Sequence, residues 1–142
     1  MPIYSLANLT TGVGSGAAGL ELRTASTDRA ALREIGATLN AATASTYGIG
    51  RPAAIGVTPT SPITWLAEDS GSPAGTAQTA LAWGTGPTVP ANFFRRWNLP
   101  ATIGAGFLLI FPAGLLIAVS ASIVLWNLAA NGAVNCHVAG DE

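Results

Sequence analysis

Lysine is absent from this 142-residue chain, and charged residues of every kind make up only 9 % of it. A soluble globular domain averages roughly 25 % charged residues, and those charges normally keep its surface from associating with other proteins. Six arginines and seven acidic residues give a formal net charge of -1, so the chain lacks the basic surface of a nucleic-acid-binding protein. The scarcity of charge favours an oligomer, whose faces are covered by copies of itself or by a partner.

Cysteine and histidine each occur once, as the neighbours Cys136 and His137. A lone cysteine forms no disulfide within its own chain, and one histidine with one cysteine supplies too few ligands for a transition-metal cluster. In a strand, adjacent side chains point to opposite faces, so these two cannot act as nucleophile and base. We interpret Cys136 as a small core residue and His137 as an exposed one. The sequence predicts no enzyme, no cofactor and no metal site.

Two short patterns could hold a ligand, but their context favours ordinary loops. Residues 14–19 read Gly-Ser-Gly-Ala-Ala-Gly, which is the spacing of a dinucleotide-binding loop. An alternating, strand-like segment follows instead of a helix, and this favours a flexible hinge over a phosphate cradle. Glu68 and Asp69 could supply oxygen ligands to a cation, but adjacent acids in a loop rich in glycine and proline are more often solvated.

The longest uncharged stretch, residues 103–130, is long enough for a transmembrane helix. Pro112, Gly114 and two serines divide it into apolar runs of five or six residues, which are typical of strands. The pair at 131–132, Asn-Gly, follows and favours a tight type I′ hairpin turn. We therefore predict soluble β-structure here, with a membrane span as the alternative.

Turn residues recur about every ten positions along the remaining chain, and short apolar or alternating segments separate them. Residues 28–42 fit a strand, although Leu32, Ile35 and Leu39 also have helical spacing, and we choose the strand. The predicted strands before residue 100 are 20–24, 28–42, 63–67, 76–83 and 93–97.

About eight strands with regular turns predict an all-β fold, a jelly-roll or related β-sandwich. We place this single domain at residues 20–142. Residues 1–19 hold one short apolar segment and a run of small, flexible residues, which is too little to build a core. We therefore predict that residues 1–19 form an extended N-terminal arm.

The densest cluster of aromatic and basic side chains is Phe93, Phe94, Arg95, Arg96 and Trp97. Aromatic residues beside basic ones can stack on single-stranded nucleic acid, but two arginines are too few for that. Arginine and tryptophan are also enriched at the hot spots of protein interfaces. No acidic residue follows before Asp141, so partners of the arginines must come from distant positions or from another chain. We predict that these five residues lie at an interface.

Three further stretches carry a family resemblance: residues 20–25 with 33–36, residues 48–53 (Gly-Ile-Gly-Arg-Pro-Ala) and residues 123–128 (Ile-Val-Leu-Trp-Asn-Leu). Together they resemble small virion proteins of tailed bacteriophages, of the decoration or cement type on the outer surface of the capsid. The resemblance implies a non-enzymatic homotrimer that clamps neighbouring major capsid proteins. In such a clamp many weak contacts add up to slow release, and an arm can add a strand to a neighbour.

Two other functions remain open from the sequence. A tail or neck accessory protein that binds a host surface receptor or glycan would expose Trp65, Trp83 or Trp97 in a groove beside polar groups. A small membrane protein would use residues 103–130 as its span.

Overall fold

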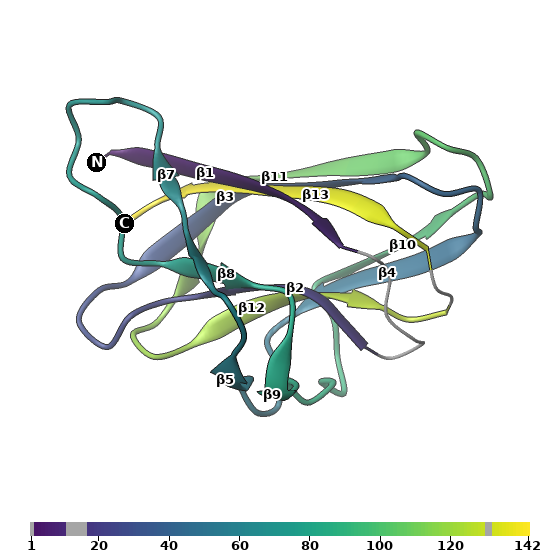
Figure 1. Cartoon of the computed structure of the whole chain (residues 1–142), viewed down its shortest axis with the longest axis horizontal. Coiled ribbons are helices and arrows are strands. Elements are labelled where there is room, and N and C mark those ends of the chain that lie inside the picture. The colour runs from purple at the N-terminus through teal and green to yellow at the C-terminus, as the bar shows by residue number, and fades with distance from the viewer. Residues whose placement is uncertain (1, 11–16, 130–131) are drawn as a thin grey trace.

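The computed structural model describes residues 2–10, 17–129 and 132–142, and in these residues the chain forms thirteen strands and no helix. The strands build two antiparallel sheets that pack face to face, and a short two-stranded ribbon lies outside one of them (Figure 1). The predicted all-β sandwich is confirmed. No helix of the described residues is long and apolar enough to cross a membrane.

The first sheet has five strands in the order β11-β3-β13-β1-β7. Its register shifts in β11 between Ile110 and Leu115, where Pro112 and Gly114 (φ +73°) interrupt the pairing with β3. These two residues therefore mark a bulge inside one long strand, and not a turn between two strands as the sequence suggested. The strands are β1 (Ile3–Thr10), β3 (Ala30–Leu39), β7 (Leu66–Ala67), β11 (Gly106–Ile117) and β13 (Val134–Asp141).

The second sheet has six strands in the order β10-β4-β12-β2-β8-β6. A separate ribbon pairs β5 (Val57–Pro59) with β9 (Trp83–Thr85). The strands of the second sheet are β2 (Ala17–Arg23), β4 (Ser45–Gly50), β6 (Ile63–Thr64), β8 (Gln78–Ala80), β10 (Arg95–Leu99) and β12 (Ser122–Asn127).

The main core lies between the two sheets and follows from the alternation of side chains along each strand. Leu20 and Leu22 of β2 point into it from one sheet, and Ile35 of β3 points into it from the other. Near the chain ends, Tyr4 stacks on the buried Trp65 with ring centroids 5.2 Å apart. The Trp65 indole nitrogen also donates to the Glu142 carboxylate at 2.5 Å, so the C-terminal residue helps to hold this end of the sandwich.

The outer face of the six-stranded sheet carries a second, smaller core. Val124 and Trp126 of β12 point away from the main core and pack against Trp83 of the ribbon and Phe93. Every residue of β12 is buried as a result. A strand that is covered on both faces reads as a continuous apolar run, which explains its sequence.

The prediction of an N-terminal arm is wrong for the described part of residues 1–19. Residues 3–10 form β1, which lies inside the five-stranded sheet between β13 and β7, with Tyr4 and Leu6 buried. Residues 17–19 begin β2. The side chains of β1 alternate between inward and outward, but the sequence does not alternate apolar with polar residues. Ile3 and Leu9 face outward, whereas Asn8 faces inward and donates to Thr79 of the other sheet at 3.0 Å. Residues 11–16, with half of the glycine-rich pattern at 14–19, lie outside the described residues.

The strand predicted at residues 28–42 is confirmed, because β3 occupies residues 30–39. The helical alternative for this segment is wrong. The apolar stretch at 103–130 also forms strands, β11 and β12, as predicted. The predicted hairpin turn at 131–132 includes a residue outside the described part of the chain.

Candidate functional site

β10 and β11 are the last strands of their sheets and lie on the same side of the sandwich (Figure 1). Trp97 of β10 stacks on Phe107 of β11 with ring centroids 4.1 Å apart, which joins the two sheets at this side. Both rings are only half-buried, because no further strand of the described chain lies beyond them. The chain thus leaves part of its aromatic core accessible here.

Arg51, which follows β4 directly, also lies on this side of the sandwich. Its guanidinium lies 5.1 Å from the centre of the Phe94 ring, and its Nη2 donates to the carbonyl oxygen of Leu116 in β11 at 2.9 Å. A cation over an aromatic face is attracted by the ring quadrupole. We call the surface made by these groups the open side, and it consists of Arg51, Phe94, Arg95, Trp97 and Phe107.

The five residues predicted as one interface do not share a surface. In the β10–β4 register, Arg95 lies beside the core residue Ile49, whereas Arg96 lies beside Gly48. Arg95 therefore points to the open side, on the same face of the strand as Trp97, and Arg96 points to the outer face of the six-stranded sheet. There the Arg96 guanidinium lies 5.6 Å from the Phe93 ring centre. That these residues lie at an interface stays a prediction.

The arginines of this region carry no ion pair within the described residues. Arg51, Arg95 and Arg96 are all exposed, and Arg95 Nη1 donates only to the neighbouring Phe94 carbonyl oxygen at 2.7 Å. The ion pairs in the described chain are instead Arg23 with Glu21, Arg33 with Asp141 and His137 with Glu34. Three unpaired positive charges thus gather around β10.

The outer face of the five-stranded sheet differs from that of the other sheet, because no described element of the chain covers it (Figure 1). Leu108, Ile110 and Leu116 of β11 point outward and are 57 %, 58 % and 62 % exposed. Ile3 and Leu9 of β1 are also exposed on this sheet. Large exposed apolar side chains on an uncovered sheet face are typical of a site that binds another protein.

A hollow of about 640 Å³ crosses this outer face. Ala139 and Gly140 of β13 line it in the middle of the sheet, and Ile3 lines it from the neighbouring strand β1. Ile110 lines it from β11, with Glu34 of β3 between Ile110 and Ala139. Small side chains at the centre and large ones around them make the sheet surface concave.

Two carboxylates, Glu34 and Glu68, also line the hollow. Arg33 and Asp141 lie there too, but their charges neutralise each other: the Arg33 Nε donates to Asp141 at 2.5 Å, and this hydrogen bond raises the pKa of Arg33. Glu68 is exposed, and it has no ion pair among the described residues. The hollow therefore combines apolar side chains with an excess of negative charge.

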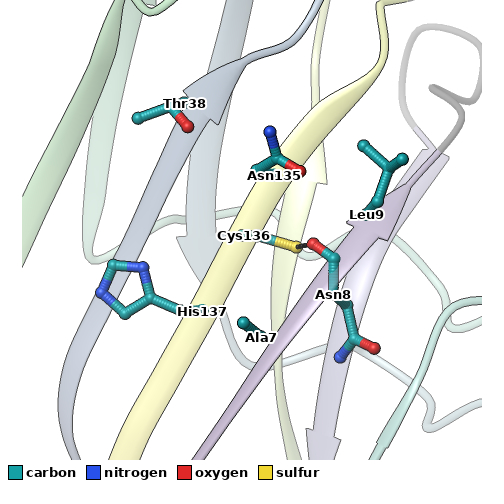
Figure 2. Close-up of a pocket in the computed structure, with 7 residues that line it drawn as sticks. All are labelled: Ala7, Asn8, Leu9, Thr38, Asn135, Cys136 and His137. Atoms are coloured by element: carbon teal, nitrogen blue, oxygen red, sulfur yellow. Dashed lines mark hydrogen bonds between the residues drawn. The ribbon is translucent and has the colours of Figure 1, made fainter.

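A smaller pocket of about 260 Å³ lies further along the same sheet, beside Cys136 and His137 (Figure 2). As predicted, the two side chains point to opposite faces: the buried Cys136 Sγ approaches the Asn8 carbonyl oxygen at 3.5 Å. Burial raises the pKa of Cys136 to about 12, so it stays a neutral thiol and not a thiolate nucleophile. His137 is half-exposed, packs over the bare backbone of Gly36 and lies 3.0 Å from Glu34.

Glu21 is a fully buried carboxylate that the sequence analysis did not identify. Its oxygens accept hydrogen bonds from Ser122 Oγ at 2.6 Å and from the Trp83 indole at 2.7 Å, and Arg23 lies 3.7 Å away. The group ties the ribbon to the six-stranded sheet. Its place in the alternating Leu20-Glu21-Leu22 pattern indicated a solvent-facing residue, since nothing local reveals the ribbon above it.

The other residues considered from the sequence are the acidic pair at 68–69 and two tryptophans. Glu68 and Asp69 are exposed, as predicted for a solvated loop, and the described residues contain no group of three or more side chains that could hold a metal ion. Trp65 is buried, and the half-buried Trp83 bonds to Glu21.

No protein-family model matches the chain, and a search of curated proteins finds no match either.

Proposed function

We propose that this chain is a non-enzymatic structural protein of a tailed-phage virion, a decoration or cement protein on the outer surface of the capsid. The observation that carries the proposal is the pair of surfaces that folding leaves uncovered: the open side, with its half-buried aromatic rings and unpaired arginines, and the apolar outer face of the five-stranded sheet. A subunit that works by clamping its neighbours needs binding surfaces of this kind, and aromatic and arginine residues supply most of the binding energy at such surfaces.

The strand order supports the jelly-roll form of the sandwich. Leaving out the short strands, one sheet has the order β11-β3-β13-β1 and the other has β10-β4-β12-β2. Strands distant in the chain are thus neighbours in space, and the chain passes from one sheet to the other between most successive long strands. Eight strands in two sheets with such long connections are the pattern of two Greek keys rolled together.

The split of the predicted interface supports two separate contacts. The open side, which contains Arg95, binds other copies in a homotrimer. The outer surface around Phe93 and Arg96, which lies on the opposite face of β10, binds the major capsid protein. One subunit then holds its own trimer and the shell at the same time, and the trimer gains slow release from several simultaneous shell contacts.

The positions of the tryptophans argue against the alternative of a receptor- or glycan-binding protein. Sugars are bound on exposed aromatic faces, but Trp65 is buried and the face of Trp97 is occupied by Phe107. The half-buried Trp83 donates its indole N–H inward to Glu21. A tail or neck protein is therefore the second candidate.

The test is the number of copies in purified virions, measured by quantitative mass spectrometry against the major capsid protein. Hundreds of copies per particle support a decoration protein. About a dozen copies would assign the chain to the tail or neck, and no copies would overturn the virion proposal.

A further inference from the structure

We infer that the open side of one copy seats in the hollow on the five-stranded sheet of a second copy, with Arg95 of the first beside Glu68 of the second. The inference rests on the proposed homotrimer and states which surfaces meet in it. The occupant of the hollow is thus the chain itself, and the charge, chemistry and position of the two surfaces support this choice.

The two surfaces carry opposite charge. The open side presents Arg51 and Arg95 without an ion pair in the described residues. The hollow presents Glu68, which has no ion pair among these residues either, and Glu34, which lies 3.0 Å from His137. An arginine that meets a carboxylate makes short, charge-assisted hydrogen bonds. Contact between copies would therefore give these exposed arginines the acidic partners that the described part of their own chain does not supply.

The apolar parts also match. On the open side, Phe94, Trp97 and Phe107 are half-buried and gain cover only if something packs against them. The hollow offers Ile3 and Ile110 as its large apolar side chains, with the small residues Ala139 and Gly140 and the carboxylate of Glu34 between them. Its volume of about 640 Å³ falls in the range of roughly 300–1,000 Å³ that holds a drug-sized group, so it can admit one or two large side chains.

β11 belongs to both surfaces. Phe107 points inward to the open side, and Ile110 points outward and lines the hollow. Arg95 and Glu68, however, lie on opposite sides of the sandwich. Arg95 is in β10, the last strand of its sheet on one side, and Glu68 follows β7, the last strand of the other sheet on the opposite side. The two residues cannot meet within one copy. A contact between two different patches is head-to-tail, and such contacts close into a ring when the rotation allows it.

Charge reversal at these two positions tests the inference on the full chain. Arg95→Glu and Glu68→Arg should each weaken association by about 10²- to 10³-fold, because a like charge then faces its partner across the contact. Arg96→Glu and Asp69→Arg are matched controls, since each makes the same change one residue away and outside the proposed contact. Both controls should keep the wild-type mass in light scattering, and circular dichroism should show the same strand content in all variants.

The double variant that combines Arg95→Glu with Glu68→Arg decides the pairing. Because every copy then carries an acid on its open side and a base in its hollow, the contact is restored with its charges exchanged, and the wild-type mass should return. Single variants that keep the wild-type mass, or a double variant that stays dissociated, would overturn the inference. Absence of the chain from virions would overturn the proposed function alone, since the charge exchange is measured without a capsid.

Discussion

Trp97 of β10 and Phe107 of β11 stack almost in parallel, with ring centroids 4.1 Å apart and ring planes 2° apart. Trp97 lies in the last strand of one sheet and Phe107 lies in the last strand of the other, and both rings belong to the open side. Arg95 lies two residues before Trp97 on the same face of β10, whereas Arg96 lies on the other face. Neighbouring arginines therefore face different surroundings.

This separation predicts different effects of two alanine variants. Arg95→Ala should weaken trimer assembly by about 2 kcal/mol, the lower end of the range for one partner of a buried interfacial pair and less than the charge reversal costs. Arg96→Ala should leave assembly unchanged but weaken capsid binding. Sedimentation measures the first, and co-pelleting with phage heads that lack the protein measures the second. If neither variant changes either property, both arginines are ordinary solvated surface.

The buried Glu21 predicts a large loss of stability. Glu21→Ala should lower the free energy of unfolding by about 3 to 5 kcal/mol, because Arg23, Ser122 and Trp83 lose the acceptor that satisfies them. Urea denaturation measures the change. Asp69→Ala is the matched control at an exposed carboxylate outside the proposed contact and should change stability by less than about 0.5 kcal/mol. Equal values for the two variants would contradict the structural role of Glu21.

Two glycines should respond differently to alanine. At Gly140 a Cβ would collide with the Ala31 carbonyl oxygen of β3, so Gly140→Ala should force the two central strands apart and lower the melting temperature. At Gly86 a Cβ meets nothing within 4 Å. Gly86→Ala should be neutral or stabilise by up to about 1 kcal/mol, because it restricts the unfolded chain. Thermal unfolding of both variants checks the β13–β3 register.

The Cys136 thiol predicts a loss of stability at alkaline pH. Burial raises its pKa from the ordinary value of 9.0 to about 12, so between these values the unfolded chain has lost a proton that the folded chain keeps. The free energy of unfolding should therefore fall as pH rises through this window, by up to about 1.4 kcal/mol per pH unit. Cys136→Ala should lack this contribution. A thiol reagent should label the native chain slowly at pH 7 and the urea-unfolded chain at once.

The sequence was sufficient to predict the fold class, because alternation and turn residues are local signals. The strand at 30–39 shows the limit of these local signals, because the spacing of Leu32, Ile35 and Leu39 also fits a helix. Pairing with β11 and β13, which lie far away in the sequence, makes this segment a strand. Similarly, residues 3–10 read as a short apolar segment, and their place between two strands depends on β13, at the other end of the chain.

The two uncharged strands near the C-terminus show why the candidate site was harder to predict. β11 and β12 have similar composition, but β12 is covered on both faces by the main core and the ribbon, while β11 keeps exposed residues such as Leu108. Composition alone therefore cannot show that β11 is exposed on one face while β12 is buried on both. The hollow was not predictable either, because it joins Glu68, Ile110 and Ala139 from three separate parts of the chain.

The most direct test of the central claim, that uncovered surfaces of this chain bind other copies of it, is the mass of the purified full chain in solution. Static light scattering at micromolar concentration should give about 43 kDa, three times the 14.2 kDa of one chain. A mass of 14.2 kDa at that concentration would contradict the claim.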